Sequence, residues 1–292
     1  MKNLFSIIFI LLFSVVYTQE LKSFQFYNQK GKRVDFGRVV KELGQYDVIL
    51  FGEHHNNSMN HWLQLRLMKA LYEVKKQHLI VGAEMFERDQ QDEINNYLNH
   101  KLDLKSFKEK VKLWSNYPTD YHPFMEFAKE HQLSFIATNI PRRYASIVAK
   151  KGLDELNHLT EEDKKWMVQI PLIIDYQALG YPEMLQMIGD HNHMQAKQFV
   201  AAQAIKDATM AETIIKNLKE DSLLLHFNGD YHSKQYGGIY WYLKYFRPAL
   251  KVAVVQILES NGNDLKLEIP TEEHFILTDF TLVLPADTNK TF

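Results

Sequence analysis

Two carboxylates, two imidazoles and one guanidinium are the side chains of this sequence whose types and spacing best suit chemistry. They are Glu53, His55, Glu84, His232 and Arg142. Carboxylates and imidazoles bind divalent metal ions, and the same groups transfer protons between a ligand and water. An arginine adds the charge that neutralises a carboxylate substrate. The residues therefore predict either a metal site made by the first four, or an acid–base pair assisted by Arg142.

The elements that must position these groups are apolar segments that end just before them. Such unbroken apolar runs are typical of parallel strands covered on both faces. The predicted strands are Val48–Phe51, Leu79–Ala83, Ser134–Thr138, Ser222–Phe227 and Lys251–Leu258. Because ligands bind at the carboxyl ends of parallel strands, we expect Glu53, Glu84, Asn139 and Asp230 to meet at one edge.

Helical periodicity separates these strands, which predicts an α/β fold with a mostly parallel central sheet flanked by helices. Ser58 is the expected N-cap of its helix, and Pro141 the expected first residue of another that ends at Gly152. The predicted helices are Phe36–Leu43, Ser58–Lys76, Asp89–Leu98, Leu104–Val111, Phe124–His131, the Pro141–Gly152 segment, Gln195–Leu218 and Tyr236–Phe246. Residues 153–193 are predicted to form a smaller helical insertion, and the tail beyond Glu259 short strands at a sheet edge.

Each site residue also has a structural explanation. Glu53 and Glu84 could cap helices or pair with Arg142 and Arg143 in an ion-pair network. The chain has 13 histidines, so a single histidine is weak support for a site. A non-catalytic protein with a structural ion-pair cluster is therefore a third alternative.

The segment Trp114–Pro123 is crowded with aromatic and proline residues. Trp114, Tyr117, Tyr121 and His122 would suit a flat apolar ligand, and tyrosinate and histidine are both haem-iron ligands. A loop that folds over the sheet edge and buries its own rings fits the same residues. The sequence leaves both alternatives open.

The N-terminus reads as a secretory signal peptide over residues 1–18. Lys2 provides the positive charge, Leu4 to Val16 is apolar, and cleavage is expected before Gln19. We expect residues 19–292 to form a single domain without a membrane-spanning segment. The protein is thus expected to be exported, either to the periplasm or out of the cell.

Composition limits the classes of function. At 46% hydrophobic and 24% charged residues, the chain has the composition of a globular protein. The formal net charge of −2 gives no indication of nucleic-acid binding. The chain has no cysteine, so we expect no disulfide, no thiolate metal site and no lipoprotein anchor.

With these residues identified, the sequence resembles the ChaN family of haem-binding proteins, part of the wider Tiki, TraB and erythromycin-esterase-like superfamily. The resemblance spans most of the mature chain. It comprises Gly52-Glu53-His54-His55-Asn56, His61 with Gln64, Glu84-Met85-Phe86-Glu87-Arg88, Trp114 with Tyr121-His122-Pro123, Asn139-Ile140-Pro141-Arg142, Gln203 with Asp207, and Asn228-Gly229-Asp230-Tyr231-His232.

The resemblance implies haem binding in homodimers, with tyrosine ligation, and a role in haem or iron uptake together with outer-membrane components. Tyr117 and Tyr121 are the positions to which the ligand role is carried, with Trp114 and His122 beside them. Tiki-like members of the superfamily are metal-dependent proteases, which implies hydrolysis as the alternative function, with a divalent metal as cofactor. Members of the family are commonly lipoproteins, and this chain differs because it has no cysteine to carry the lipid.

A second departure is the last motif. It usually resembles Gly-Asn-Gly-His, whereas here Asp230 and Tyr231 lie between Gly229 and His232. The added carboxylate and phenol are expected to alter the chemistry of that corner.

Overall fold

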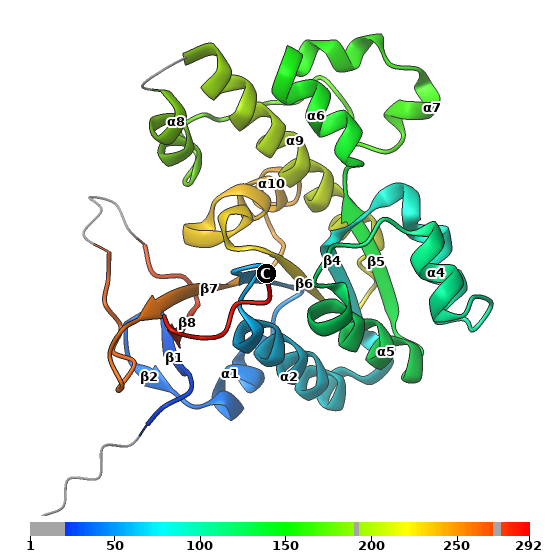
Figure 1. Ribbon diagram of the computed structural model, residues 1–292. Coiled ribbons are helices and arrows are strands. Elements are labelled where there is room, and N and C mark those ends of the chain that lie inside the picture. Colours follow the sequence, from blue (N-terminus) through cyan, green and yellow to red (C-terminus); the bar gives the residue numbers. More distant parts are fainter. Residues whose placement is uncertain (1–20, 190–192, 271–275) are drawn as a thin grey trace, which may run out of the picture.

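The computed structural model describes residues 21–189, 193–270 and 276–292, with the side chains of 188, 189 and 193 not described. The predicted signal peptide lies outside these residues. The strands form one eight-stranded sheet in the order β2-β1-β8-β7-β3-β6-β4-β5 (Figure 1). Their bounds are β1 Gln25–Asn28, β2 Arg33–Val34, β3 Val48–Glu53, β4 Leu79–Glu87, β5 Ser134–Asn139, β6 Leu223–Gly229, β7 Val252–Ser260 and β8 Phe280–Pro285.

The sheet is parallel from β8 to β5, and β1 and β2 form an antiparallel pair at one edge. This confirms the predicted α/β fold with a mostly parallel sheet. Strand β3 lies between β7 and β6, and its last residue, Glu53, is level with Gly229 at the end of β6. The carboxyl ends of β3 and β6 therefore bring two of the sequence motifs to the same place.

The predicted edge position of the tail is wrong. Strand β8 pairs with β7 on one side and with β1 on the other, so it lies inside the sheet. Phe280, Leu282 and Leu284 are buried in the main apolar core. A strand paired on both sides and covered on both faces explains why this short segment is almost wholly apolar.

Helices cover both faces of the sheet (Figure 1). Successive residues of β3 show why: Ile49 and Phe51 pack in one apolar cluster, and Val48 and Leu50 in the other, as expected for side chains that alternate along a strand. Helices α1 to α5 pack on the first face, and α6, α9 and α10 on the second. The helices are α1 Phe36–Leu43, α2 Ser58–Lys75, α3 Gln91–Leu98, α4 Leu104–Lys110, α5 His122–Glu130, α6 Arg142–Lys151, α7 Glu161–Lys164, α8 Tyr181–Gly189, α9 His193–Asn217 and α10 Gly238–Phe246.

Two predicted helix starts shift by one residue. Asn57, not Ser58, caps α2, because its side chain accepts a hydrogen bond from the Asn60 N–H. Pro141 is the N-cap of α6 rather than its first residue. The predicted end of α6 is confirmed: Gly152 follows with φ of 93°, a conformation that favours glycine.

Residues 153–189 form the predicted helical insertion, in short pieces that include α7 and α8. Met167, Val168 and Ala178 of this segment are buried in the same cluster as α9 and α10. The insertion therefore extends one face of the main core, and α8 lies beside α9 above the sheet (Figure 1).

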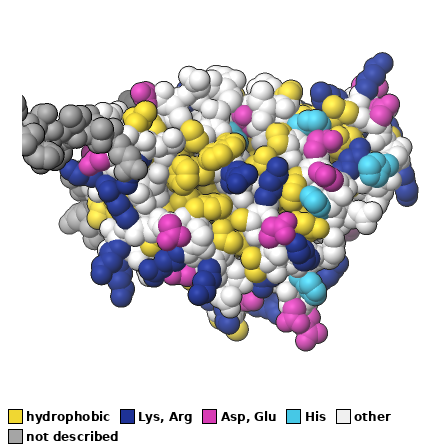
Figure 2. All heavy atoms as spheres, turned by 90° about the horizontal axis from the view of Figure 1, so that it is seen from below, with side chains coloured by type: hydrophobic (Ala, Val, Ile, Leu, Met, Phe, Trp, Pro, Cys, Tyr) yellow, Lys and Arg dark blue, Asp and Glu magenta, His cyan; other side chains and the backbone are white. Residues whose placement is uncertain are grey.

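The opposite face of the molecule, seen from below, mixes apolar and charged side chains (Figure 2). Exposed apolar side chains also occur on α2, where Trp62 is 49% and Val74 58% exposed. None of the helices within the described residues is long and apolar enough to cross a membrane.

Candidate functional site

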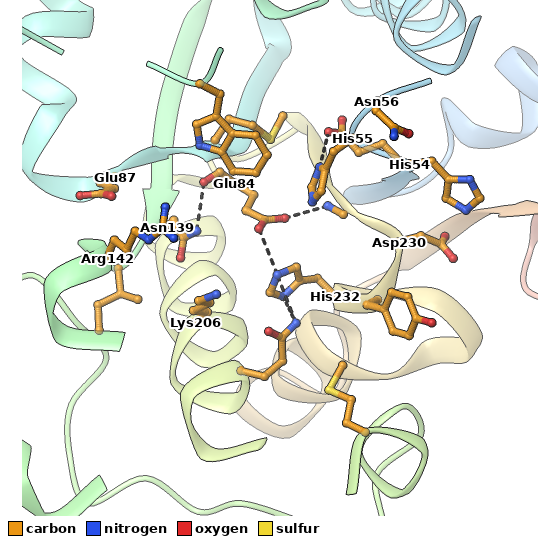
Figure 3. Close-up of a pocket in the computed structure, with 18 of the residues that line it drawn as sticks. His54, His55, Asn56, Glu84, Glu87, Asn139, Arg142, Lys206, Asp230 and His232 are labelled. Carbon is orange, nitrogen blue, oxygen red and sulfur yellow. Dashed lines mark hydrogen bonds and ion pairs between the residues drawn. The ribbon is translucent and has the colours of Figure 1, made fainter. Parts of the chain in front are cut away.

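A cavity of about 810 Å³ opens at the carboxyl ends of β3, β4 and β6 (Figure 3). Six of the predicted site residues line it: Glu53, His55, Glu84, Trp114, Arg142 and His232. Ligand sites lie at this edge of parallel sheets. Its polar lining includes Glu53, His54, His55, Glu84, Glu87, Asn139, Arg142, Gln203, Lys206, Asp230 and His232, and its apolar lining Met85, Trp114, Ile140, Met184, Met187, Phe199, Tyr231 and Phe292.

Two glycines allow the strand ends to approach this closely. A Cβ atom on Gly52 would lie 2.3 Å from Oδ1 of Asp230, and one on Gly229 would lie 2.7 Å from Nε2 of His55. Any larger residue at either position would displace a side chain that lines the cavity. The glycines of both strand-end motifs are thus required by packing.

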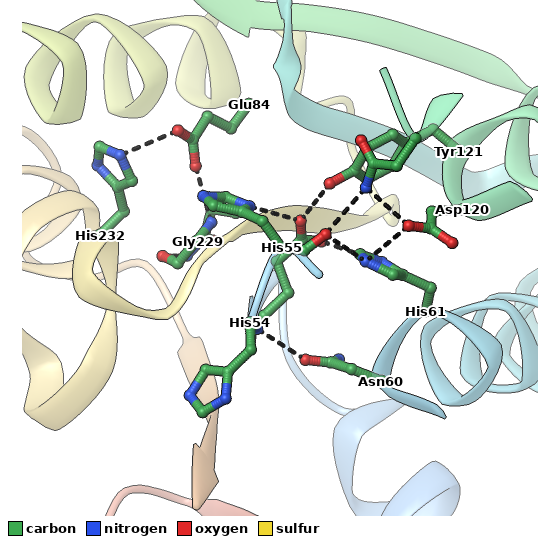
Figure 4. A network of polar contacts seen from close by, with 12 residues as sticks. His54, His55, Asn60, His61, Glu84, Asp120, Tyr121, Gly229 and His232 are labelled. Carbon is green, nitrogen blue, oxygen red and sulfur yellow. Dashed lines mark hydrogen bonds and ion pairs between the residues drawn. The ribbon is translucent and has the colours of Figure 1, made fainter. Parts of the chain in front are cut away.

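Glu53 is the centre of one hydrogen-bond network. Figure 4 shows His55, His61 and Tyr121, which surround it. Its Oε1 accepts hydrogen bonds from Tyr121 Oη at 2.7 Å and from His55 Nδ1 at 2.8 Å. Its Oε2 accepts one from Gln64 Nε2 at 2.9 Å. Burial alone would raise the pKa of Glu53, but the His61 and His55 imidazoles and the Tyr121 hydroxyl outweigh it and hold the pKa below its usual value. Glu53 is therefore an ionised group that fixes His55 in place.

A second network runs from Tyr181 to Gly229 through three ionisable residues. Tyr181 donates to Oδ2 of Asp207 at 2.7 Å, and Oδ1 of Asp207 contacts Nδ1 of His232. His232 Nε2 lies 3.1 Å from Oε1 of Glu84, whose Oε2 accepts a hydrogen bond from the Gly229 N–H at 2.7 Å. Glu84 is thus paired on both oxygens.

This second network holds a proton on His232. Burial would lower the pKa of that imidazole, but the carboxylates of Glu84 and Asp207 together raise it to about 9. His232 is only 6% exposed at its side chain. An imidazolium between two carboxylates therefore lies at the floor of the cavity at neutral pH.

The chain beyond β8 completes the opening of the cavity. Lys290 bridges to Asn57, and the Thr291 N–H donates a hydrogen bond to the Asn56 carbonyl at 2.9 Å. These bonds place Phe292 among the lining residues. The wall of the cavity therefore joins segments from nearly opposite ends of the sequence.

Of the four residues predicted from the aromatic segment, only Trp114 lines the cavity. Trp114 lines the cavity and its ring packs 4.8 Å from that of His55. Tyr117 and Tyr121 are 2% and 1% exposed, and both hydroxyls lie in the interior. His122 contacts Glu126 at 3.4 Å and does not line the cavity. The loop thus buries two of its rings, the second of the alternatives stated above, and haem ligation by Tyr117 or Tyr121 stays a prediction.

Sequence reasoning did not assign roles to Asp207, Lys206 or Tyr231. Asp207 and Lys206 are neighbours on α9, a helix with apolar residues on much of its surface. The resemblance included Asp207 in one of its motifs, which was the available signal. A buried carboxylate in a long apolar helix indicates a partner of opposite charge elsewhere.

The predicted divalent-metal site has no support in the described part of the chain. No group of three or more His, Asp or Glu residues there has an arrangement that could hold a metal ion. The physical reason is that the candidate ligands bind one another: Glu53 holds His55, and Glu84 holds His232 and the Gly229 N–H.

This fold and cavity define a class: α/β proteins that bind a ligand at the carboxyl edge of a parallel sheet. Residues 39–243 match the family of haem-binding uptake proteins of the Tiki superfamily, ChaN. The chain belongs to this family, which confirms the resemblance found in the sequence.

One solved structure supports the fold. ChaN of Campylobacter jejuni, in a structure that describes cofacial haem binding, superimposes with a TM-score of 0.69 at 17% identity, covering 91% of this chain and 98% of that one. A mutant of the erythromycin esterase EreC in its open conformation gives a TM-score of 0.48 at 10% identity, with 89% and 83% covered. A search of curated proteins finds no match.

Proposed function

We propose that this protein binds haem in the cavity and serves haem uptake or trafficking at the cell envelope. Family membership supports haem as the ligand. The predicted signal peptide supports export, and the family resemblance supports work as a homodimer alongside outer-membrane uptake components. The observation that carries the proposal is the cavity itself, whose volume of about 810 Å³ lies in the range of small-molecule and cofactor sites.

The lining of the cavity suits haem chemically. Haem combines a flat apolar ring, an iron that takes an axial oxygen or nitrogen ligand, and two carboxylate side chains. Met187, Phe199 and Phe292 line the cavity with 70%, 46% and 65% of their surfaces exposed. Exposed apolar side chains gathered at one opening indicate a binding surface. Haem would bury them.

Tyr231 is the residue that we propose as the iron ligand. It lines the cavity and is 46% exposed, so a ligand can reach its side chain without a change in the fold. Tyr117 and Tyr121 are buried, and Tyr121 already donates to Glu53. Ligation by either would require the segment around Trp114 to open. Bound haem would supply an iron centre for transport, while the protein supplies the phenolate and the apolar walls.

The experiment is a haem titration of the purified protein, followed by its visible absorption spectrum. The Tyr231→Phe variant is expected to lose the tyrosinate-type spectrum, and Tyr117→Phe and Tyr121→Phe to keep it. Tyr245→Phe is the matched control, because Tyr245 is 50% exposed but does not line the cavity. A spectrum lost in Tyr121→Phe and kept in Tyr231→Phe would return the ligand role to the aromatic segment. Absence of saturable binding in the parent protein would reject the function.

A second candidate function is hydrolysis, favoured by the pair of His55 and Glu53. Glu53 fixes Nδ1 of His55, which leaves Nε2 as the nitrogen available to a ligand in the cavity. Such an imidazole accepts a proton from water as the water attacks an ester or amide carbonyl. A panel of nitrophenyl esters, assayed with and without added divalent metal ions, tests this. Equal rates for the parent and His55→Gln proteins would reject it.

A further inference from the structure

One wall of the cavity carries two cationic side chains. Arg142, at the start of α6, and Lys206, on α9, both line the cavity, and neither forms an ion pair with a described residue. Two nearby arginines, in contrast, do form ion pairs. Arg88 pairs with Glu212 at 2.8 Å, and Arg143 pairs with Asp89 at 2.6 Å. Of these four basic residues, the two that line the cavity are the two without an ion pair among the described residues.

Asn139 lies on the same wall of the cavity and is itself incompletely bonded. Figure 3 shows Asn139, Arg142 and Lys206 on the same side of the cavity. Asn139 is 9% exposed, and its Nδ2 donates to the Glu84 carbonyl at 3.1 Å, whereas its Oδ1 is buried without a hydrogen-bond partner. A buried acceptor without a donor is costly. This oxygen suits an inward-turned guanidinium or ammonium group, which it would orient toward a ligand.

The acidic residues near this wall form no ion pair with either cation among the described residues, although the charge of Lys206 helps to lower the pKa of Glu84. Glu84 is bonded on both oxygens, to His232 and to the Gly229 N–H. Glu87 accepts a hydrogen bond from the backbone N–H of Arg142, and the described residues show no ion pair between Glu87 and the Arg142 or Lys206 side chain. Lys206 and Arg142 therefore remain available to an anion from outside the chain.

We propose that Arg142, Lys206 and Asn139 form a carboxylate-recognition subsite that binds the propionate groups of haem. Arg142 has the planar donors for two parallel hydrogen bonds to a carboxylate, and Lys206 adds a point charge. The apolar residues at the opening then contact the ring. This inference rests on the proposed function, since it assigns the polar end of the same ligand.

The test compares two ligands that differ only at the propionates. Haem and its dimethyl ester are titrated separately into the parent protein and into the Arg142→Gln/Lys206→Met double variant. The parent is expected to bind haem at least about tenfold more tightly than the ester. The double variant is expected to bring that ratio near one and to leave the affinity for the ester unchanged.

Lys216→Met is the matched control, because Lys216 lies on the same helix and pairs with Glu212 at 3.0 Å. It is expected to keep the ratio of the parent, and circular dichroism checks that each variant is folded. Equal binding of haem and ester by the parent would overturn the subsite and leave the haem function standing. A ratio that survives in the double variant would also overturn it. No binding of either porphyrin would overturn both proposals.

Discussion

The proton held between Glu84 and Asp207 makes the stability of the protein depend on pH in a calculable way. The pKa of His232 is raised from 6.5 to about 9 in the folded protein. The folded state therefore binds one more proton than the unfolded state between these two pH values. The stabilisation is fully present below pH 6.5 and is lost as the pH rises through 9.

The size of the effect follows from the same two values. Each pH unit between them is worth about 1.4 kcal/mol, so this one residue should lower the free energy of unfolding by about 3 kcal/mol as the pH passes from 6.5 to 9. The Asp207→Asn substitution removes one of the two carboxylates and keeps the side-chain size. It should lower the pKa of His232, so the decrease in the free energy of unfolding should be complete at a lower pH.

Urea denaturation followed by tryptophan fluorescence, at half-unit steps of pH, measures this dependence. Other groups titrate in the same range, so the informative quantity is the difference between the parent and Asp207→Asn curves. Asp154→Asn is the control, since Asp154 is an exposed carboxylate outside the network of Tyr181, Asp207, His232 and Glu84. Its curve should run parallel to that of the parent. Parallel curves for the parent and Asp207→Asn proteins would refute the account of a proton shared along this chain.

Three further outcomes are expected. Burial raises the pKa of Asp230 from 3.8 to about 6, so its ionisation costs stability progressively between these two pH values and fully above pH 6. Asp230→Asn should therefore raise the free energy of unfolding by up to about 3 kcal/mol at pH 8 and by much less at pH 4. Urea denaturation at both pH values measures this. Tyr121→Phe removes a hydrogen bond to buried Glu53 and should lower the free energy of unfolding by about 1–3 kcal/mol. Tyr117→Phe should lower it by less, because the Tyr117 hydroxyl has no hydrogen-bond partner among the described residues. Equal losses of stability for the two variants in thermal denaturation would contradict this. Gly52→Ala should cost about 1–3 kcal/mol by overpacking against Asp230, more than Gly44→Ala, where the nearest contact is 3.3 Å.

The sheet was predictable because each core strand is apolar on both faces. Val48–Phe51 shows the limit of this signal. The strand continues to Glu53, which is 2% exposed, and no periodicity rule extends a strand into a carboxylate. Burial of Glu53 depends on three donors, of which Tyr121 lies 68 residues away. Such a distant partner is visible only after folding.

The position of the candidate site was predictable from the sequence, but the hydrogen-bond partners of its residues were less so. Parallel topology alone brought Glu53, Glu84 and His232 together. The partner of His232 on the helix side, Asp207, lies 25 residues earlier. A carboxylate in a long helix faces the core or the solvent depending on the rotation of that helix, which its own sequence does not determine when apolar residues occupy much of the surface.

The bridge between Lys290 and Asn57 has a practical consequence. It holds the chain so that Phe292 lies at the opening of the cavity. An affinity tag or reporter domain fused after Phe292 would emerge at that opening and would obstruct a ligand as large as a porphyrin. Purification for binding studies is therefore better served by a tag placed before Leu21 or inserted at the exposed turn between β1 and β2.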